Sequence, residues 1–122
     1  MRRLLSVVVS VYNEEEALAQ FYQVTEGILN TISWDYELVF VNDGSRDQSL
    51  SILNHLADSN PKVKVVSFSR NFGHEAAMIA GIDYSQGDGI ICMDADLQHP
   101  PACIPEIIRR FEDGYEVINM VR

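Results

Sequence analysis

The stretch GIICMDADLQHP, from Gly89 to Pro100, contains the pattern that decides the fold. A short apolar run is followed at once by two aspartates, Asp94 and Asp96, with a single residue between them. An apolar run of this length is typical of a strand that is buried on both faces of a parallel sheet. Two carboxylates at the end of such a strand repel one another. We therefore ask whether a metal ion, a proton, a lysine or only water accompanies them.

The rest of the chain alternates further apolar runs with helical segments. Strands are predicted over Leu4–Val11, Tyr36–Val41, Val63–Phe68, Gly89–Met93 and Tyr115–Val121. Four helices are expected between them: one capped by Asn13, one opened by a capping box of Ser45 and Gln48, one starting near His74 and one from Pro105 to about Asp113. This alternation predicts an α/β fold, a Rossmann-like and mainly parallel sheet with helices on both faces.

Length and composition narrow the class of protein. The 122 residues are 47% apolar and 22% charged, which suits a single globular domain over residues 1–122. The net charge of −9 argues against a general nucleic-acid binder, which needs a basic surface. Two cysteines, Cys92 and Cys103, are too few for a disulfide framework and favour a reducing cytosolic compartment. The last predicted strand runs to the end of the chain, so we expect a domain that is truncated at its carboxyl terminus.

Acidic side chains follow three of the predicted strands. Glu14 comes after the first strand, Asp43 after the second, and Asp94 and Asp96 after the fourth. In an open parallel sheet ligands bind beyond the carboxyl ends of the strands, so these acids should surround one crevice. In extended chain Asp94 and Asp96 face the same side, ~6.6 Å apart. A hard divalent cation would relieve their repulsion, and magnesium is commonly held by one or two carboxylates together with substrate phosphates.

Each of these residues also has a simpler interpretation. Asp94 and Asp96 are compatible with loop acids, Asp43 with an ordinary Asp-Gly turn, and Glu14 with an acid in a helix's first turn. Arg70 either binds phosphate, pairs with an acid or is solvated. His74 is interpreted as the first residue of a helix.

Five motifs in order along the chain resemble glycosyltransferase family 2: VVVSVYNEEEAL, LVFVNDGSRDQS, SRNFGHEAAMIAGI, MDADLQHPP and YEVINMVR. They look most like the polyprenyl-phosphate branch, which includes dolichol-phosphate mannose synthases and bactoprenol glucosyltransferases. The resemblance implies a GT-A fold and an inverting transfer of sugar from a nucleotide-diphosphate sugar, such as UDP-glucose, to a polyprenyl phosphate. It also implies Mg²⁺ or Mn²⁺ as cofactor. The full-length protein is expected in the cytoplasm at the inner face of the membrane, which a carboxy-terminal region beyond this chain would contact.

The resemblance assigns roles to individual residues. Contacts to the donor nucleotide are expected from Tyr12, Glu14, Val41, Asp43, Asp94, Ala95 and Arg122, with a phosphate or sugar contact from Arg70. The metal is expected at Asp96 and Gln98, with Asp94 assisting, and Asp96 is the candidate catalytic residue. One departure is Ser10, where the family usually has proline, and this should alter the following turn.

Two other classes remain as alternatives. A non-catalytic nucleotide-sugar-binding module would show the same crevice without transfer. A phosphoacceptor receiver domain also gathers acids beyond strand ends, but it needs a phosphorylated aspartate after the third strand, where this chain has SFSR, and a lysine after the fifth. A domain without its remaining half would also expose apolar surface, so a homo-oligomer is a further expectation.

Overall fold

The computed structural model describes residues 3–95, 103–112 and 117–119 of the chain. In chain order its elements are β1 (Leu4–Val11), α1 (Leu18–Leu29), β2 (Asp35–Asn42), α2 (Ser49–Ser59), β3 (Val63–Ser67), α3 (His74–Tyr84), β4 (Gly89–Asp94), α4 (Ile104–Glu112) and β5 (Val117–Asn119). The predicted alternation of strands and helices is confirmed, and β1 has the predicted bounds. No helix of the described residues is long and apolar enough to cross a membrane.

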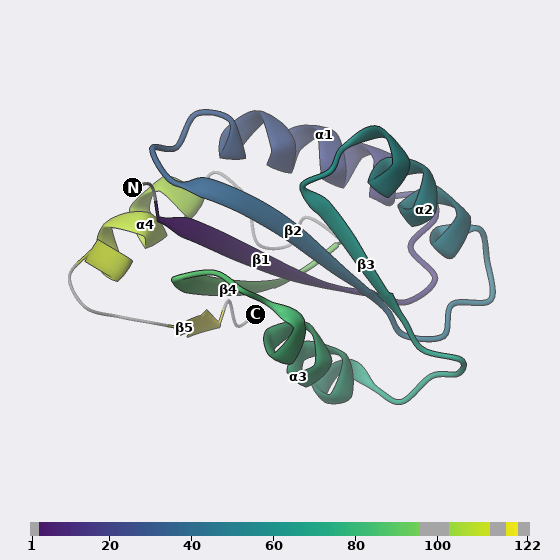
Figure 1. The fold of residues 1–122 in the computed structure, drawn as a ribbon. Coiled ribbons are helices and arrows are strands. Elements are labelled where there is room, and N and C mark those ends of the chain that lie inside the picture. The colour runs from purple at the N-terminus through teal and green to yellow at the C-terminus, as the bar shows by residue number, and fades with distance from the viewer. Residues whose placement is uncertain (1–2, 96–102, 113–116, 120–122) are drawn as a thin grey trace.

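The five strands form one parallel sheet in the order β3-β2-β1-β4-β5 (Figure 1). Strand β1 is central, pairing with β2 over its whole length and with β4 from Leu5 to Ser10. The chain winds outward from β1 in one direction through β2 and β3, and then in the other through β4 and β5. The strand order therefore reverses beside β1, between β2 and β4. Open α/β sheets bind their ligands at the carboxyl ends of strands at such a reversal.

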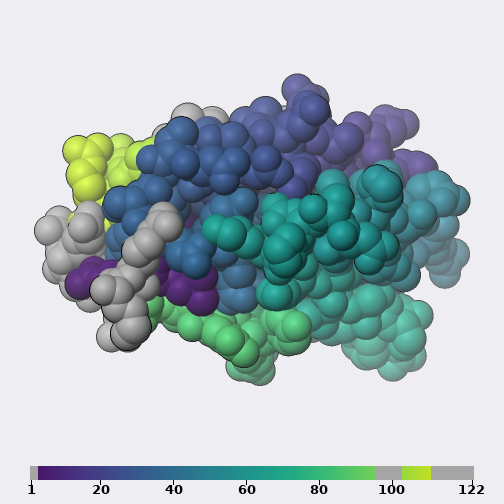
Figure 2. Space-filling model, turned by 45° about the horizontal axis from the view of Figure 1, so that its top comes forward, coloured from purple at the N-terminus to yellow at the C-terminus, as the bar shows by residue number. Residues whose placement is uncertain are grey.

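Helices cover both faces of the sheet, as predicted. Side chains of α1, α2 and α4 pack on one face, in a core that includes Val7, Val9 and Phe21. Among the described elements, helix α3 alone packs on the other face, with Val8 in its core. Successive residues of a strand point to opposite faces, so β1 supplies both cores. Figure 2 shows the violet-to-blue surface of α1 along the top of the molecule, beside the blue-green surface of α2.

Helix α3 makes a close contact with the sheet at one glycine. A Cβ added at Gly81 would stand 2.3 Å from Cγ1 of Val8 and 3.1 Å from Cγ2 of Val41. Real Cβ atoms essentially never approach as closely as the first of these distances, so a side chain at this position would push the helix away from β1. Gly81 therefore sets the height of α3 above the central strand.

The predicted start of the first helix is wrong. Helix α1 begins at Leu18, and Asn13 lies five residues earlier with a φ of 52°, in the left-handed region that asparagine tolerates. The capping box of Ser45 and Gln48 is wrong as well, because the Gln48 side chain makes no capping hydrogen bond. Both errors have one cause, since Asn13 and Ser45 bond to each other's loops instead of to helix ends.

A buried polar network closes the amino-terminal edge of the sheet. The Ser6 hydroxyl donates to Oε2 of Glu37 at 2.6 Å and accepts from the backbone N–H of Gly87 at 2.9 Å. The backbone N–H of Gln86 donates to the same Glu37 oxygen at 2.8 Å. The network ties β1 and β2 to the chain that enters β4, at the end of the sheet away from the acidic turns.

Candidate functional site

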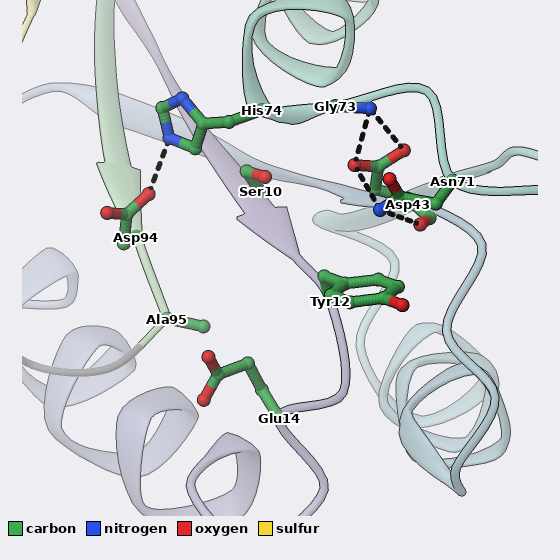
Figure 3. Close-up of a pocket in the computed structure, with 9 residues that line it drawn as sticks. All are labelled: Ser10, Tyr12, Glu14, Asp43, Asn71, Gly73, His74, Asp94 and Ala95. Atoms are coloured by element: carbon green, nitrogen blue, oxygen red, sulfur yellow. Dashed lines mark hydrogen bonds and ion pairs between the residues drawn. The ribbon is translucent and has the colours of Figure 1, made fainter.

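A cavity of about 410 Å³ opens at the carboxyl edge of the sheet (Figure 3). Its walls come from the ends of β1, β2 and β4 and from the loop that leads into α3. The lining residues are Ser10, Tyr12, Glu14, Asp43, Asn71, Gly73, His74, Asp94 and Ala95. The structure thus brings together three of the four acids that the strand order places at one crevice, Glu14, Asp43 and Asp94.

Asp43 is buried and holds the loop before α3. Its Oδ1 accepts from the backbone N–H of Phe72 at 2.7 Å and of Gly73 at 3.3 Å. Its Oδ2 accepts from the Gly73 N–H at 3.0 Å and from the Asn71 side-chain amide at 3.0 Å. With 2% of its surface exposed, the carboxylate relies on these donors in place of water. In this structure Asp43 therefore holds the loop before α3 in one conformation, as a clamp between that loop and β2.

The other end of the same loop reaches Asp94. Nε2 of His74, the first residue of α3, lies 2.7 Å from Oδ1 of Asp94, the last residue of β4. Figure 3 shows the imidazole extending over β1 toward the end of β4. The Asp94 side chain is 14% exposed, whereas that of His74 is 58% exposed. The pair thus joins the loop before α3 to the strand that carries the acidic motif.

The loops after β1 and β2 are bonded to one another. The backbone N–H of Asn13 donates to Oγ of Ser45 at 3.0 Å, and Oδ1 of Asn13 accepts from the backbone N–H of Arg46 at 2.8 Å. The next two N–H groups of the first loop donate to Ser49 and Asp47. These motif residues therefore fix the shape of the loops that carry Tyr12, Glu14 and Asp43.

Asp47 shows the electrostatic effect of these bonds. Desolvation on its own would raise the pKa of this carboxyl, but it is outweighed. Hydrogen bonds from Ser49 and from the backbone N–H of Glu15 hold the pKa below its ordinary value of 3.8. The acid is therefore ionised at neutral pH, where it accepts from the backbone N–H groups of Glu15 and Ser49.

A second hollow, of about 490 Å³, lies on the other side of Tyr12 and Asn71. Arg46 and Arg70 both line it, and none of its described lining residues is Asp or Glu. The guanidinium carbon of Arg70 lies 4.8 Å from the centre of the Phe72 ring. Arg70 is thus in the hollow beside the acidic pocket, and its phosphate or sugar contact stays a prediction.

The remaining predicted site residues have different surroundings. Ala95 lines the pocket and is buried, but Val41 is wholly buried in the core beneath α3 and is not among the lining residues. Asp96, Gln98 and Arg122 lie outside the described residues. Within the described ranges no three His, Cys, Asp or Glu side chains gather into a group that could hold a metal. The metal-binding roles therefore remain predictions.

Sequence reasoning missed the contributions of Asn71, Gly73 and His74. A helix that follows a parallel strand begins at the carboxyl edge of the sheet, so its first residues face the same crevice as the acidic turns. That signal was present in the order of the elements. Helical periodicity alone identifies His74 only as the start of a helix.

Several solved structures share this fold. A mannosyltransferase from Pyrobaculum calidifontis, in complex with GDP-Man and Mn²⁺, matches 93% of this chain with a TM-score of 0.79 and 20% identity, over 34% of its own length. S. aureus TarS in complex with UDP-GlcNAc matches 79% of the chain with a TM-score of 0.67 and 24% identity, over 27% of its length. At these identities the comparison establishes the GT-A fold alone.

Sequence comparison then establishes the family. Residues 6–122 match the model of glycosyl transferase family 2, and the chain belongs to that family. It is 49% identical over 117 residues to an uncharacterized glycosyltransferase, YkcC, of Bacillus subtilis, and 46% identical over 114 residues to a prophage bactoprenol glucosyl transferase homolog of Escherichia coli. These matches cover 96% and 93% of this chain but 36% and 37% of the relatives, so the chain spans little more than a third of their length.

Proposed function

We propose that the protein carrying this chain transfers a sugar from a nucleotide-diphosphate sugar to a polyprenyl phosphate, and that this chain binds the donor. The observation that carries the proposal is the pocket that gathers Glu14, Asp43 and Asp94 beside Tyr12 at the strand-order reversal. The names of several relatives, bactoprenol glucosyl transferases among them, support a lipid acceptor and a glucosyl donor. UDP-glucose is accordingly the donor that we propose.

The pocket suits a nucleoside next to a diphosphate. Tyr12 is 44% exposed, so its ring offers a flat apolar surface against which a base can stack. Acids alone would repel a diphosphate, so a cation has to lie between them and the donor. Asp94 suits that purpose, because its carboxylate is partly buried at the end of β4 and Mg²⁺ and Mn²⁺ prefer oxygen ligands. Asp96 and Gln98 follow closely in the sequence and complete the proposed ligand set.

The charges suggest how the reaction proceeds. Departure of the nucleotide leaves negative charge on a diphosphate, and a divalent cation supplies the positive charge that stabilises it. Asp94, the last residue of β4, and Asp96, two residues later in the sequence, would hold that cation. A phosphate acceptor is already anionic, so it attacks the anomeric carbon with little need of a general base. Attack from the face opposite the leaving diphosphate would invert the configuration.

A transfer assay with the whole protein tests the function. Radiolabelled UDP-glucose and a polyprenyl phosphate should yield a labelled lipid in the presence of Mg²⁺ or Mn²⁺, and chelation with EDTA should stop the reaction. Labelled lipid that forms at the same rate in EDTA would contradict the metal requirement. No labelled lipid with any nucleotide sugar, despite tight donor binding, would favour the non-catalytic module.

Calorimetry on the chain itself tests donor binding. UDP-glucose should bind more tightly with Mn²⁺ than without it, and Asp96→Ala should abolish the gain from Mn²⁺. Asp58→Ala is the matched control, because Asp58 is exposed on α2, away from the pocket. Equal affinities of the wild-type chain and Asp96→Ala in Mn²⁺ would overturn the proposed role of Asp96.

A further inference from the structure

We propose that His74 is a positioning residue for the cation site, which it serves by fixing the orientation of the Asp94 carboxylate. The inference rests on the proposed function, because it assumes that Asp94 faces the cation bound with the nucleotide. It adds a residue that neither the sequence motifs nor the comparisons with relatives assign. His74 itself is not proposed to contact the donor or the cation.

The inference requires one direction for the hydrogen bond between the two residues. Nε2 of His74 lies 2.7 Å from Oδ1 of Asp94, and because an ionised carboxylate can only accept, Nε2 has to carry the proton and donate it. A bond to one oxygen limits rotation of the carboxylate about its terminal torsion, which is otherwise soft. The second oxygen of Asp94 is thereby held in one direction, as a ligand for a metal must be.

His74 is held in place from two sides. On the loop side, both oxygens of Asp43 bind the backbone N–H of Gly73, the residue just before His74. Gly73 has a φ of 107°, a conformation that side chains rarely adopt, and it lets the chain turn directly into α3. On the helix side, Gly81 seats α3 against Val8 of the central strand. The imidazole is therefore attached to a fixed helix end, from which its ring reaches Asp94.

The exposure of the two side chains separates this role from simple packing. The imidazole is 58% exposed, so its removal leaves no buried cavity and little lost apolar contact. The Asp94 side chain is only 14% exposed, so it has few water molecules to replace a missing donor. Loss of His74 should therefore affect Asp94 much more than it affects the stability of the fold.

The test compares three variants of the 122-residue chain. His74→Leu removes the donor, whereas His74→Gln keeps a side-chain N–H that reaches toward Asp94. His55→Leu is the control, because His55 is also exposed but lies on α2. For each chain we would measure Mn²⁺ affinity with saturating UDP, UDP affinity without metal, and the thermal midpoint. Long-range ¹H–¹⁵N NMR correlations of the wild-type chain would show which nitrogen of His74 carries the proton.

Loss of a residue that orients a metal ligand typically weakens metal affinity by a factor of 10 to 100. We therefore expect His74→Leu to bind Mn²⁺ about tenfold more weakly or worse, with unchanged metal-free UDP affinity and thermal midpoint. His74→Gln should recover most of the affinity, His55→Leu should match the wild type, and Nε2 should be protonated.

Four results would overturn the inference: wild-type Mn²⁺ affinity in His74→Leu, equal losses in the leucine and glutamine variants, an unprotonated Nε2, or a wild-type chain that binds UDP but no Mn²⁺. A chain that binds Mn²⁺ but no UDP would instead contradict the proposed function. The comparison of His74 variants, made then with Mn²⁺ alone, would still decide the inference.

Discussion

Asp43 binds the backbone N–H of Gly73 with both oxygens of its carboxylate, at 3.3 and 3.0 Å. The acid belongs to the turn after β2, while the glycine precedes α3, 30 residues later in the chain. The contact therefore joins two walls of the pocket. Asp43 therefore stabilises the loop before α3 even when no nucleotide is bound.

Asp43→Asn should destabilise the chain as well as weaken nucleotide binding. The asparagine side chain would place an NH₂ group where a carboxylate oxygen accepts from the backbone N–H groups of the loop. A buried donor without an acceptor costs about 1–3 kcal/mol. Chemical denaturation and UDP calorimetry measure the two effects separately. Asp83→Asn, an exposed change on α3, is the control. Weaker UDP binding at unaltered stability would show that Asp43 is a base contact and not a clamp.

Gly44→Ala should be among the most damaging single changes in the chain. Gly44 has a φ of 69°, and an added Cβ would lie 2.2 Å from the backbone carbon of Arg70. The strained backbone alone costs roughly 1–2 kcal/mol, and the neighbouring backbone cannot simply rotate away. Gly27→Ala is the matched control, because nothing lies within 4 Å of its added Cβ in α1. That change should stabilise the chain by about 0.5–1 kcal/mol in urea denaturation. Similar stabilities for the two variants would refute the crowding argument.

Ser6→Ala should lower stability without affecting the nucleotide site. The change removes the donor of a buried hydrogen bond to Glu37 and the acceptor of a partly buried one from the Gly87 N–H, at the amino-terminal edge of the sheet. We expect a loss of about 1–3 kcal/mol in the free energy of unfolding. UDP affinity, measured well below the unfolding midpoint, should stay at the wild-type value. Ser51→Ala, on the exposed side of α2, should change neither quantity. A fall in UDP affinity with Ser6→Ala would show that the two edges are coupled.

The two cysteines should differ sharply in how fast they react with thiol reagents. Burial raises the pKa of the Cys92 thiol to about 11, so roughly one in a thousand is ionised at pH 8, and Cys103 is exposed. The thiolate is the reactive form, so iodoacetamide should modify Cys103 in the folded chain and reach Cys92 only after denaturation. Peptide mass spectrometry of briefly labelled protein distinguishes the two. Equal labelling under native conditions would mean that β4 opens readily.

Much of the architecture was predictable because it depends on local patterns. Apolar runs such as Leu4–Val11 identify strands, and the alternation with helices determines the parallel sheet and the edge at which Glu14, Asp43 and Asp94 meet. The loops were less predictable, because their bonds join distant residues. Asn13 and Arg46 are 33 positions apart, so a rule that considers only a residue's near neighbours in the sequence does not pair them. Local capping rules therefore assigned Asn13 to a helix that begins at Leu18.

In the site, too, local patterns were predictable and contacts between distant residues were not. The acids were found because they follow strands, whereas the bond between His74 and Asp94 depends on how far α3 lies above β1. That height is set by the contact of Gly81 with Val8, which appears only in three dimensions. Periodicity indicates that a helix begins at His74, but it does not indicate which carboxylate the imidazole meets.

The mutual bonding of the loops after β1 and β2 has a consequence for anyone who recombines this family. Asn13, Glu14 and Glu15 obtain partners for their backbone N–H groups from Ser45, Ser49 and Asp47, and Arg46 obtains one from Asn13. A chimera that takes one loop from a relative and keeps the other would risk all four bonds at once. Donor preference should therefore be transplanted with both loops as a single cassette, residues 12–17 together with 43–49.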